Sequence, residues 1–299
     1  MSILDEFKLT FQRGTSLTKL IYLNIFVFLA IRIYYVIYYL FTPESLRIQL
    51  PELSILKWLS VPTDISKLII MPWTIITYMF LHYDFIHILF NMLWLYWFGK
   101  IFLQHLSQKK LLTVYILGGI AGAVLFILFF NVFPAFQTII HDATALGASA
   151  SVIAIVISIS FYIPNYAISI LFFGPVKLKY IAIITILIDI ISITAENPGG
   201  HIAHLGGAIF GIFFIFQYQK GKDITKWFDR IMDNVTIMFK RNKKSKINFK
   251  CATNDMDYNQ AKAQQQEEIN KILDKISKSG YDSLTKNEKN ILFNMSNKK

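Results

Sequence analysis

Four polar residues with useful chemistry stand in otherwise apolar stretches of the chain: His87, Asn91, Ser149 and His204. Serine is a weak nucleophile until a positioned base removes its proton, and a neutral histidine can act as that base. Ser149 comes two residues after Gly147 and opens an apolar run. At the first turn of a helix, unpaired N–H groups and the positive end of the helix dipole would stabilise a negative oxygen beside this serine. Ser149 is therefore a candidate nucleophile, although serine at such a place most often only caps the helix.

His87 and Asn91 are four residues apart, which puts both side chains on one face of a helix. Two polar side chains inside an apolar helix are costly unless they meet a partner. One interpretation is that they point hydrogen-bond donors at a common spot. The other is that they hold helices together through interhelical hydrogen bonds, and the spacing allows both.

His204 is followed by Gly207 and Gly211, three and seven residues later, on the same face of a helix. Glycines at this spacing let a second helix approach closely. If that helix is the one that begins at Ser149, His204 can reach the serine hydroxyl.

The composition limits the class of protein that can carry these residues. The chain has 299 residues, 54% of them hydrophobic, and a mean hydropathy of +0.45. This is too apolar for an ordinary soluble domain and indicates a polytopic membrane protein. A helix needs about 20 apolar residues to cross the hydrocarbon core. We expect an all-α bundle of six membrane helices, at about residues 20–40, 82–100, 111–133, 149–163, 180–194 and 202–218.

Basic residues set the expected orientation in the membrane. They flank the spans on one side, and the connections 131–148 and 195–203 contain none. By the positive-inside rule, both termini lie in the cytoplasm and Ser149 lies on the outer side. Residues 219–299 hold 18 Lys and Arg against 10 Asp and Glu, which favours attraction to an anionic lipid leaflet over nucleic-acid binding. The single cysteine, Cys251, excludes an intrachain disulfide framework.

The chain is expected to divide into three parts: a cytoplasmic segment at 1–19, the membrane domain at 20–218 and a basic cytoplasmic tail at 219–299. Residues 41–71 read as a mixed loop that lies at the membrane interface. Asp189, inside the fifth expected span, reads as an internal hydrogen-bonding residue.

The tail has its own pattern. Apolar residues at helical spacing end at Gly280, and Thr285 with Glu288 is typical of a capping box. We expect a small helical hairpin over about 261–295, with a docking or regulatory role and an unknown partner.

Three motifs, in this order on the second, fourth and sixth expected spans, resemble the rhomboid family of intramembrane serine proteases: His87-xxx-Asn91, Gly147-x-Ser149, and Ala203-His204 with Gly207 and Gly211. The resemblance covers about residues 20–218 and leaves the tail out. It implies a catalytic dyad without a third acid, in which Ser149 is the nucleophile and His204 the general base and then the general acid.

The resemblance also implies an oxyanion hole made by His87, Asn91 and the Ser149 backbone N–H. Gly147, Gly207 and Gly211 match structural positions near the site. The implied protein is a serine-type endopeptidase of the cell (inner) membrane whose active site opens to the outer side. Its partners would be the lipid bilayer and single-pass or polytopic membrane substrates, cleaved in or near a spanning segment without metal or other cofactor.

The sequence departs from the family pattern at three places. Ala150 replaces the glycine often found after the serine, Ile153 replaces an aromatic residue that packs on the histidine, and Thr74 replaces an arginine after Trp73. These departures concern how the histidine is positioned and how the first loop is anchored.

Two other functions are possible for the same residues. Histidines and a carboxylate in the spans could serve a metal or ion transporter: His82, His87, His201, His204 and Asp189. Against this, the chain has no HExxH pattern, and glutamate is absent from every expected span. The other alternative is a catalytically silent rhomboid-like binding protein, which usually lacks the serine or the histidine.

Overall fold

The computed structural model describes residues 14–43, 52–170, 174–195, 197–239, 267, 270–280, 283–285 and 287–290. The chain forms two units, Met1–Met238 and Phe239–Lys299, which are described separately. The long helices are α2 (Ser16–Phe41), α6 (Phe85–His105), α7 (Gln108–Val132), α8 (Ser149–Tyr162), α9 (Leu178–Ile191), α10 (Pro198–Gln219) and α11 (Lys226–Phe239). The short elements are α3 (Glu52–Leu59), β1 (Val61–Pro62), α4 (Ile65–Ile70), α5 (Thr74–Thr77), η2 (Tyr78–Phe80), η3 (Pro134–Phe136), β2 (Thr144–Ala145), β3 (Ala167–Ile170), β4 (Gly174–Lys177) and η4 (Ser192–Thr194).

Four of these helices, α2, α6, α7 and α10, are long and apolar enough to cross a membrane. Helix α8 is also apolar but has 14 residues, and α9 has 14 as well. The all-α, polytopic membrane fold expected from the sequence is confirmed. Six crossings in all stay a prediction.

Short polar side chains determine where the membrane helices begin. The Asp84 carboxylate accepts a hydrogen bond from the His87 backbone N–H at 2.7 Å and caps α6. Asn197 caps α10, with Pro198 at its first position. The expected start of the second span near His82 is therefore wrong, since α6 begins after Asp84. The expected start of the sixth span near residue 202 is one turn too late.

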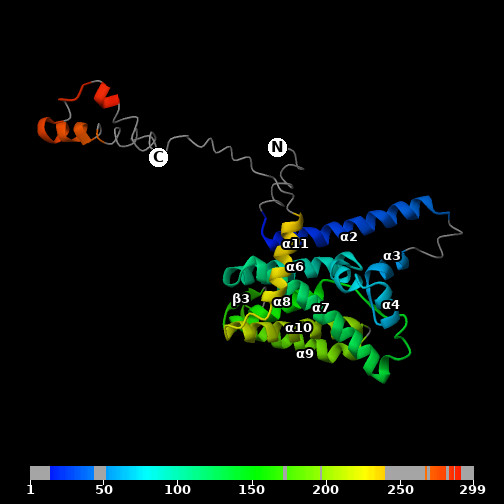
Figure 1. Cartoon of the computed structure of the whole chain (residues 1–299). Helices are drawn as coiled ribbons and strands as arrows, with labels where there is room; N and C mark the ends of the chain where they lie inside the picture. Colours follow the sequence, from blue (N-terminus) through cyan, green and yellow to red (C-terminus); the bar gives the residue numbers. More distant parts are fainter. Residues whose placement is uncertain are drawn as a thin grey trace. The chain divides into compact units, whose positions relative to one another are not determined.

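Helices α7, α8 and α10 pack closely at the centre of the bundle, with α6 and α9 beside α8 (Figure 1). Small residues make this possible. A methyl group on Gly207 of α10 would lie 2.1 Å from the Ala150 carbonyl oxygen of α8. One on Gly118 of α7 would lie 2.3 Å from the Ala154 Cβ. Because its neighbours approach so closely, α8 is buried from Ala150 to Ser160.

The segment that leads into α6 is folded rather than a mixed loop. Helices α3 and α4 lie within 41–71, so that expectation is wrong for the described part of the segment. Trp58 and Trp73 stack with ring centroids 6.2 Å apart, and the Trp73 indole donates to the Trp58 carbonyl at 2.9 Å. Strand β1 pairs antiparallel with β2, with Val61 opposite Ala145. The approaches to α6 and to α8 are thus tied to each other.

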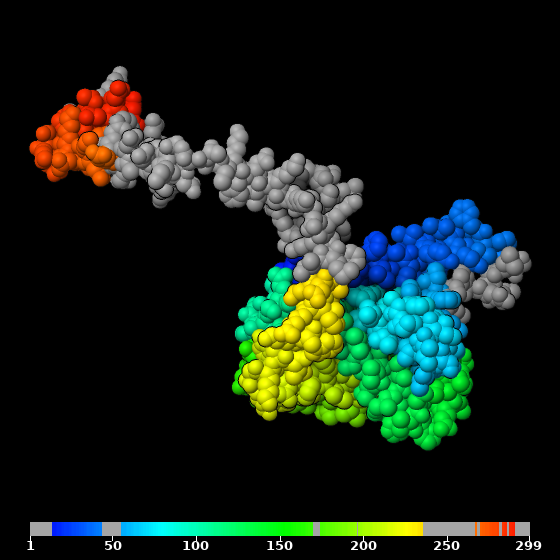
Figure 2. Space-filling model, viewed as in Figure 1, coloured from blue at the N-terminus to red at the C-terminus, as the bar shows by residue number. Residues whose placement is uncertain are grey.

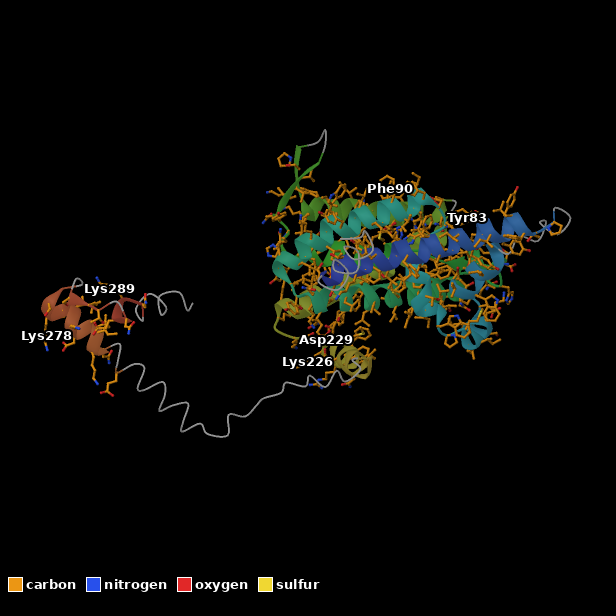
Figure 3. The ribbon with its side chains drawn as sticks, turned by 90° about the horizontal axis from the view of Figure 1, so that it is seen from above. Tyr83, Phe90, Lys226, Asp229, Lys278 and Lys289 are labelled. Atoms are coloured by element: carbon orange, nitrogen blue, oxygen red, sulfur yellow. The ribbon has the colours of Figure 1, made fainter. Side chains whose placement is uncertain are left out.

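Helix α11 is attached to the bundle by a set of polar residues, all buried except the partly exposed Asp223 and named here the Lys110 cluster: Lys110, Thr113, Asp223, Thr225 and Asp229. The Lys110 ammonium donates to both aspartates at 2.6 Å and to the Thr225 hydroxyl at 2.7 Å. Thr113 donates to Asp229 at 2.6 Å. Figure 2 shows α11 (yellow) packed on the bundle, and in Figure 3 Asp229 lies on the side of α11 nearest the membrane helices. Burial raises the pKa of the Asp223 carboxyl, but hydrogen bonds from Lys110 and Thr225 outweigh it and lower the pKa overall.

The second unit contains a helix over 270–279, and Gly280 follows it with a φ of +75°. The expected stop at Gly280 is confirmed. The capping box is confirmed too, because Glu288 accepts from the Thr285 N–H at 2.7 Å and donates its own N–H to the Thr285 hydroxyl at 3.4 Å. The Thr285 N–H and the Lys275 ammonium lower the pKa of Glu288 to about 2. The rest of the expected hairpin, Cys251 and residues 1–13 lie outside the described residues.

Candidate active site

Ser149 is the first residue of α8 and is partly exposed. The N-cap position is occupied by Ala148, and no side chain caps this helix. The N-cap interpretation of Ser149 is therefore wrong. Within the described part of the chain, the Ser149 hydroxyl makes no hydrogen bond, so it is available for chemistry beside the positive end of a buried helix.

Gly147 shapes the turn that presents Ser149. Its φ of +134° lies in a region that L side chains rarely adopt. Its N–H donates to the Tyr78 carbonyl at 2.9 Å. The Cβ position that Gly147 lacks lies 3.1 Å from His87 Nε2 and 3.4 Å from Ser149 Oγ. The serine hydroxyl and the His87 ring therefore both lie next to this glycine.

His87 and Asn91 lie one turn apart at the start of α6, as their spacing predicts. One N–H of the Asn91 amide donates to the His87 carbonyl at 2.9 Å, within the same helix. An amide nitrogen carries two donors, so one remains for a ligand. Among the described residues, neither side chain makes an interhelical hydrogen bond, which disfavours the interpretation of the pair as a link between helices.

One cavity of about 550 Å³ brings the candidate residues together. It is lined by Ser149 from α8, His204 from α10, and His87 and Asn91 from α6, while α9 contributes Asp189. Most of the remaining wall is apolar and includes Phe90, Trp94, Val152, Ile153 and Ile188. Apolar cavities with a few convergent polar groups are the usual form of a binding site. Ser149 and His204 share the cavity without a mutual hydrogen bond, and catalytic hydrogen bonds are often long before substrate binds.

Three residues at the α9–α10 contact form a tight polar group, named here the Asp189 cluster: Asp189, His201 and His204. The Nδ1 atoms of both histidines lie 2.8 Å from the same oxygen, Asp189 Oδ1. Asp189 is 4% exposed, and the two histidine side chains are about one-fifth to one-quarter exposed. The expectation that Asp189 hydrogen-bonds internally is confirmed.

The sequence predicts His201 only as a local polar residue near the mouth of the active site, and Asp189 only as an internal hydrogen-bonding residue. The spacing of His201 and His204, three residues apart, puts both on one helix face and could have indicated His201. Nothing in the sequence indicates which residue of α9 meets that face, because the pairing of two helices depends on tertiary packing.

The Asp189 cluster has the composition of a metal site, since one ligand atom from each residue lies within 4.8 Å of the others. Two zinc ligands at bond lengths near 2.0–2.1 Å in a tetrahedral site lie about 3.3 Å apart. The nitrogen–oxygen distances of 2.8 Å are shorter and match hydrogen bonds. The geometry therefore favours hydrogen bonds over metal coordination.

Two of the residues that depart from the family pattern, Ile153 and Thr74, make contacts within the bundle. Ile153 lines the cavity and packs in a small apolar cluster with Ile157, Ala182 and Ala208. Thr74 is buried, and its hydroxyl donates to the Met71 carbonyl at 2.7 Å.

These features define a polytopic helical membrane protein with a serine and a histidine in one cavity of the helix bundle. A family model described as "Rhomboid domain" matches residues 71–220, half of the chain, and the chain belongs to the rhomboid family. A second model, a family of unknown function (DUF6576), matches residues 252–298.

The chain is similar to "RHOMBOID-like protein 12, mitochondrial" of Arabidopsis thaliana. The two are 32% identical over 158 residues, which are 50% of this chain and 47% of the relative. The chain thus matches about half the length of that relative.

Proposed function

We propose that this protein is an intramembrane serine endopeptidase that cleaves membrane proteins in or near their spanning segments. The observation that carries the proposal is the single cavity shared by Ser149, His204, His87 and Asn91, which come from three different helices. Membership of the rhomboid family supports the same class of reaction.

In the proposed reaction, Ser149 Oγ attacks the scissile carbonyl carbon while its proton passes to His204 Nε2. The new C–O bond converts the carbonyl oxygen into an oxyanion. His204 then protonates the leaving nitrogen, the C–N bond breaks, and an acyl-serine remains. A water molecule then gives a proton to His204 and attacks the ester carbonyl. The C–Oγ bond breaks, the acid product leaves, and His204 returns the proton to Ser149 Oγ. All the proton transfers use one histidine, so the reaction needs no metal or other cofactor.

The oxyanion would be stabilised by three groups: the His87 ring, the free N–H of the Asn91 amide and the Ser149 backbone N–H. Preorganised donors of this kind are worth most where water is excluded. The apolar wall of the cavity suits such a site and also suits a substrate segment from the membrane.

We propose that the protein spans the cell (inner) membrane several times, with both termini in the cytoplasm. The Lys110 cluster holds the start of α7 and the segment after α10 together at one end of the bundle. Ser149 starts α8, whose other end lies near His105 at the end of α6. Lys110 and its neighbour Lys109 therefore lie at the end away from Ser149, which supports an active site that opens to the outer side.

The test is a pair of measurements on purified protein in detergent: labelling by a fluorophosphonate probe and cleavage of a transmembrane reporter. We expect probe labelling at Ser149 and complete loss of cleavage in Ser149→Ala and His204→Ala. The double variant should be no worse than either single variant, because the two residues act as one unit.

Other outcomes would support the alternatives. Cleavage that survives Ser149→Ala and is abolished by a chelator would indicate a metal site. A folded wild-type protein that neither reacts with the probe nor cleaves the reporter would indicate a silent binding protein.

A further inference from the structure

Asp189 is a buried carboxylate in an otherwise apolar helix. It lies in α9, whose neighbouring residues in sequence are isoleucines, and it is 4% exposed. A charged side chain at membrane depth is costly unless partners satisfy it. Among the described residues, the hydrogen-bond partners of its side chain are His201 and His204, both from α10.

The acceptor in both hydrogen bonds is a single oxygen, Asp189 Oδ1, at 2.8 Å from each Nδ1 atom. An ionised carboxylate can only accept, so each histidine must carry its proton on Nδ1. In a neutral imidazole the other nitrogen then has a free lone pair. For His204, that leaves Nε2 unprotonated, which is the state needed to accept a proton from Ser149.

We infer that Asp189 is a positioning residue that holds His204 in the Nδ1–H tautomer and aims its Nε2 at Ser149. The inference rests on the proposed serine-protease function and adds a third member to the Ser149–His204 pair. The resemblance to rhomboids implies a dyad without an acid, so this chain departs from that pattern. Among the described residues, Asp189 makes no hydrogen bond to Ser149, and it acts through the histidine.

His201 completes the arrangement from the other side. Its Nδ1 occupies a second lone pair of Asp189 Oδ1, and its ring meets the His204 ring edge-on, with centroids 5.7 Å apart. The carboxylate therefore has donors in two directions, which fixes its rotation about the side-chain bond. Ile153 lines the same cavity but has no hydrogen-bonding group. The hydrogen bond that orients the His204 ring therefore comes from Asp189.

The charge also stabilises the imidazolium that forms when His204 takes the serine proton. Other titratable groups around His204 are histidines: His201 on α10 and His87 on α6, across the cavity. Neither supplies negative charge. Asp189 on α9 is therefore the acidic group of the described cavity lining that can balance the transient positive charge.

The first test is the kinetics of Asp189→Asn with a transmembrane reporter. We expect kcat to fall at least tenfold and up to about 10⁴-fold, the loss seen when a catalytic histidine is left in the wrong tautomer, while KM changes less than about twofold. The matched control is Thr194→Val, just beyond the same end of α9, where the hydroxyl bonds the Ile191 carbonyl and no other group among the described residues. It should leave kcat unchanged. Adding Asp189→Asn to His204→Ala should cause no further loss.

The second test needs no variant to fold. In wild-type protein with ¹⁵N-labelled histidine, NMR should report His204 protonated on Nδ1 and unprotonated on Nε2. A wild-type His204 protonated on Nε2 instead would overturn the inference. So would an active wild type whose turnover is unchanged in a folded Asp189→Asn variant.

The failure of the proposed function is distinguishable from these outcomes. A wild type without Ser149-dependent turnover would overturn both the protease function and the positioning role of Asp189. A normal turnover in Asp189→Asn would overturn the positioning role alone. Wild-type activity that is removed by a chelator and restored by zinc would also overturn the inference, since the Asp189 cluster would then hold a metal.

Discussion

His87 and Asn91 are the residues at which catalysis and helix packing can be separated by experiment. In the proposed reaction each directs a donor at the oxyanion, and removal of one such donor typically costs about 10²–10³ in turnover, or roughly 3–4 kcal/mol. We expect His87→Ala and Asn91→Ala to be slow but measurable, and probe labelling to weaken while it stays at Ser149. Turnover per folded molecule is the measurement.

Stability supplies the control for these variants. The amide of Asn91 bonds the His87 carbonyl within its own helix, so its removal breaks no link between helices. The melting temperature should change little. A large drop in melting temperature with normal turnover would show that the pair acts in packing.

Gly147 tests whether the backbone turn itself shapes the site. In Gly147→Ala the new methyl would meet the His87 ring at 3.0 Å, in a backbone conformation that strains any L residue by about 1–3 kcal/mol. Because small displacements at a reacting centre are costly, we expect turnover to fall about 10²-fold. Gly174→Ala is the matched control, since its φ is +72° and nothing lies within 4 Å. A similar loss of turnover in both variants would contradict a local effect at the site.

The residues of the site differ in how far the sequence could predict them. Four residues can be identified from the sequence because a polar side chain in an apolar segment is costly unless it has a partner or a function: His87, Asn91, Ser149 and His204. The link from Asp189 to two histidines could not be predicted, because it depends on how α9 rotates against α10. Whether the four residues act as the family resemblance implies stays a prediction.

At the scale of the elements, the attachment of α11 to the bundle through the Lys110 cluster can be tested by its effect on stability. In Lys110→Met the buried Asp229 carboxylate and the partly exposed Asp223 carboxylate lose their cation, and breaking a buried pair such as Lys110–Asp229 costs about 3–5 kcal/mol. Lys109→Met is the matched control, because Lys109 and its partner Asp233 are both well exposed and such pairs are worth about 0–1 kcal/mol. The melting temperature in detergent should fall clearly in the first variant and hardly in the second.

The same variant has a predicted pH dependence. The pKa of Asp223 is lowered in the folded protein, so its pairing stabilises the fold above the ordinary Asp pKa and is lost as the pH falls through the lowered value. In Lys110→Met the carboxylates are unpaired, and acid neutralises them. The difference in melting temperature between wild type and variant should therefore shrink as the pH falls below about 4. A difference that grows in acid would contradict this account.

The sequence predicts the bounds of a helix well where the apolar run is continuous. It predicts them less well where short polar segments determine where a helix begins or ends. The apolar runs gave the positions of α2, α7 and α8 to within a few residues. The predicted start near His82 is wrong for α6 because the Asp84 side chain caps the helix, which begins at Phe85. Residues 41–71 read as a loop because their short helices are stabilised by tertiary contacts, such as the stacking of Trp58 on Trp73, rather than by periodicity.

At the scale of the whole molecule, the orientation in the membrane can be tested at the single cysteine. If both termini are cytoplasmic, Cys251 should be protected from an impermeant maleimide in intact cells and labelled after permeabilisation. A cysteine introduced at residue 137, in the connection before Ser149, should show the reverse. Labelling of Cys251 in intact cells would invert the topology and move the active site to the other side.

The boundary between the two units gives the last prediction. The rhomboid family match ends at residue 220, but the Lys110 cluster needs Asp223 and Asp229, which lie beyond it. A chain that stops after Phe239 keeps α11 and the whole cluster, and removes the unit that contains the DUF6576 match. We expect this truncation to leave reporter turnover in detergent nearly intact. A chain that stops after Gly221 loses α11 and the three residues that bind the Lys110 ammonium, so its melting temperature should fall by at least as much as that of Lys110→Met. The pair of truncations therefore separates the stabilising contacts made by residues 222–239 from any part that the second unit takes in the reaction.

If the chain that stops after Phe239 loses turnover as completely as Ser149→Ala while its melting temperature is normal, the second unit takes part in the reaction. The assignment of the chemistry to the membrane domain alone is then wrong.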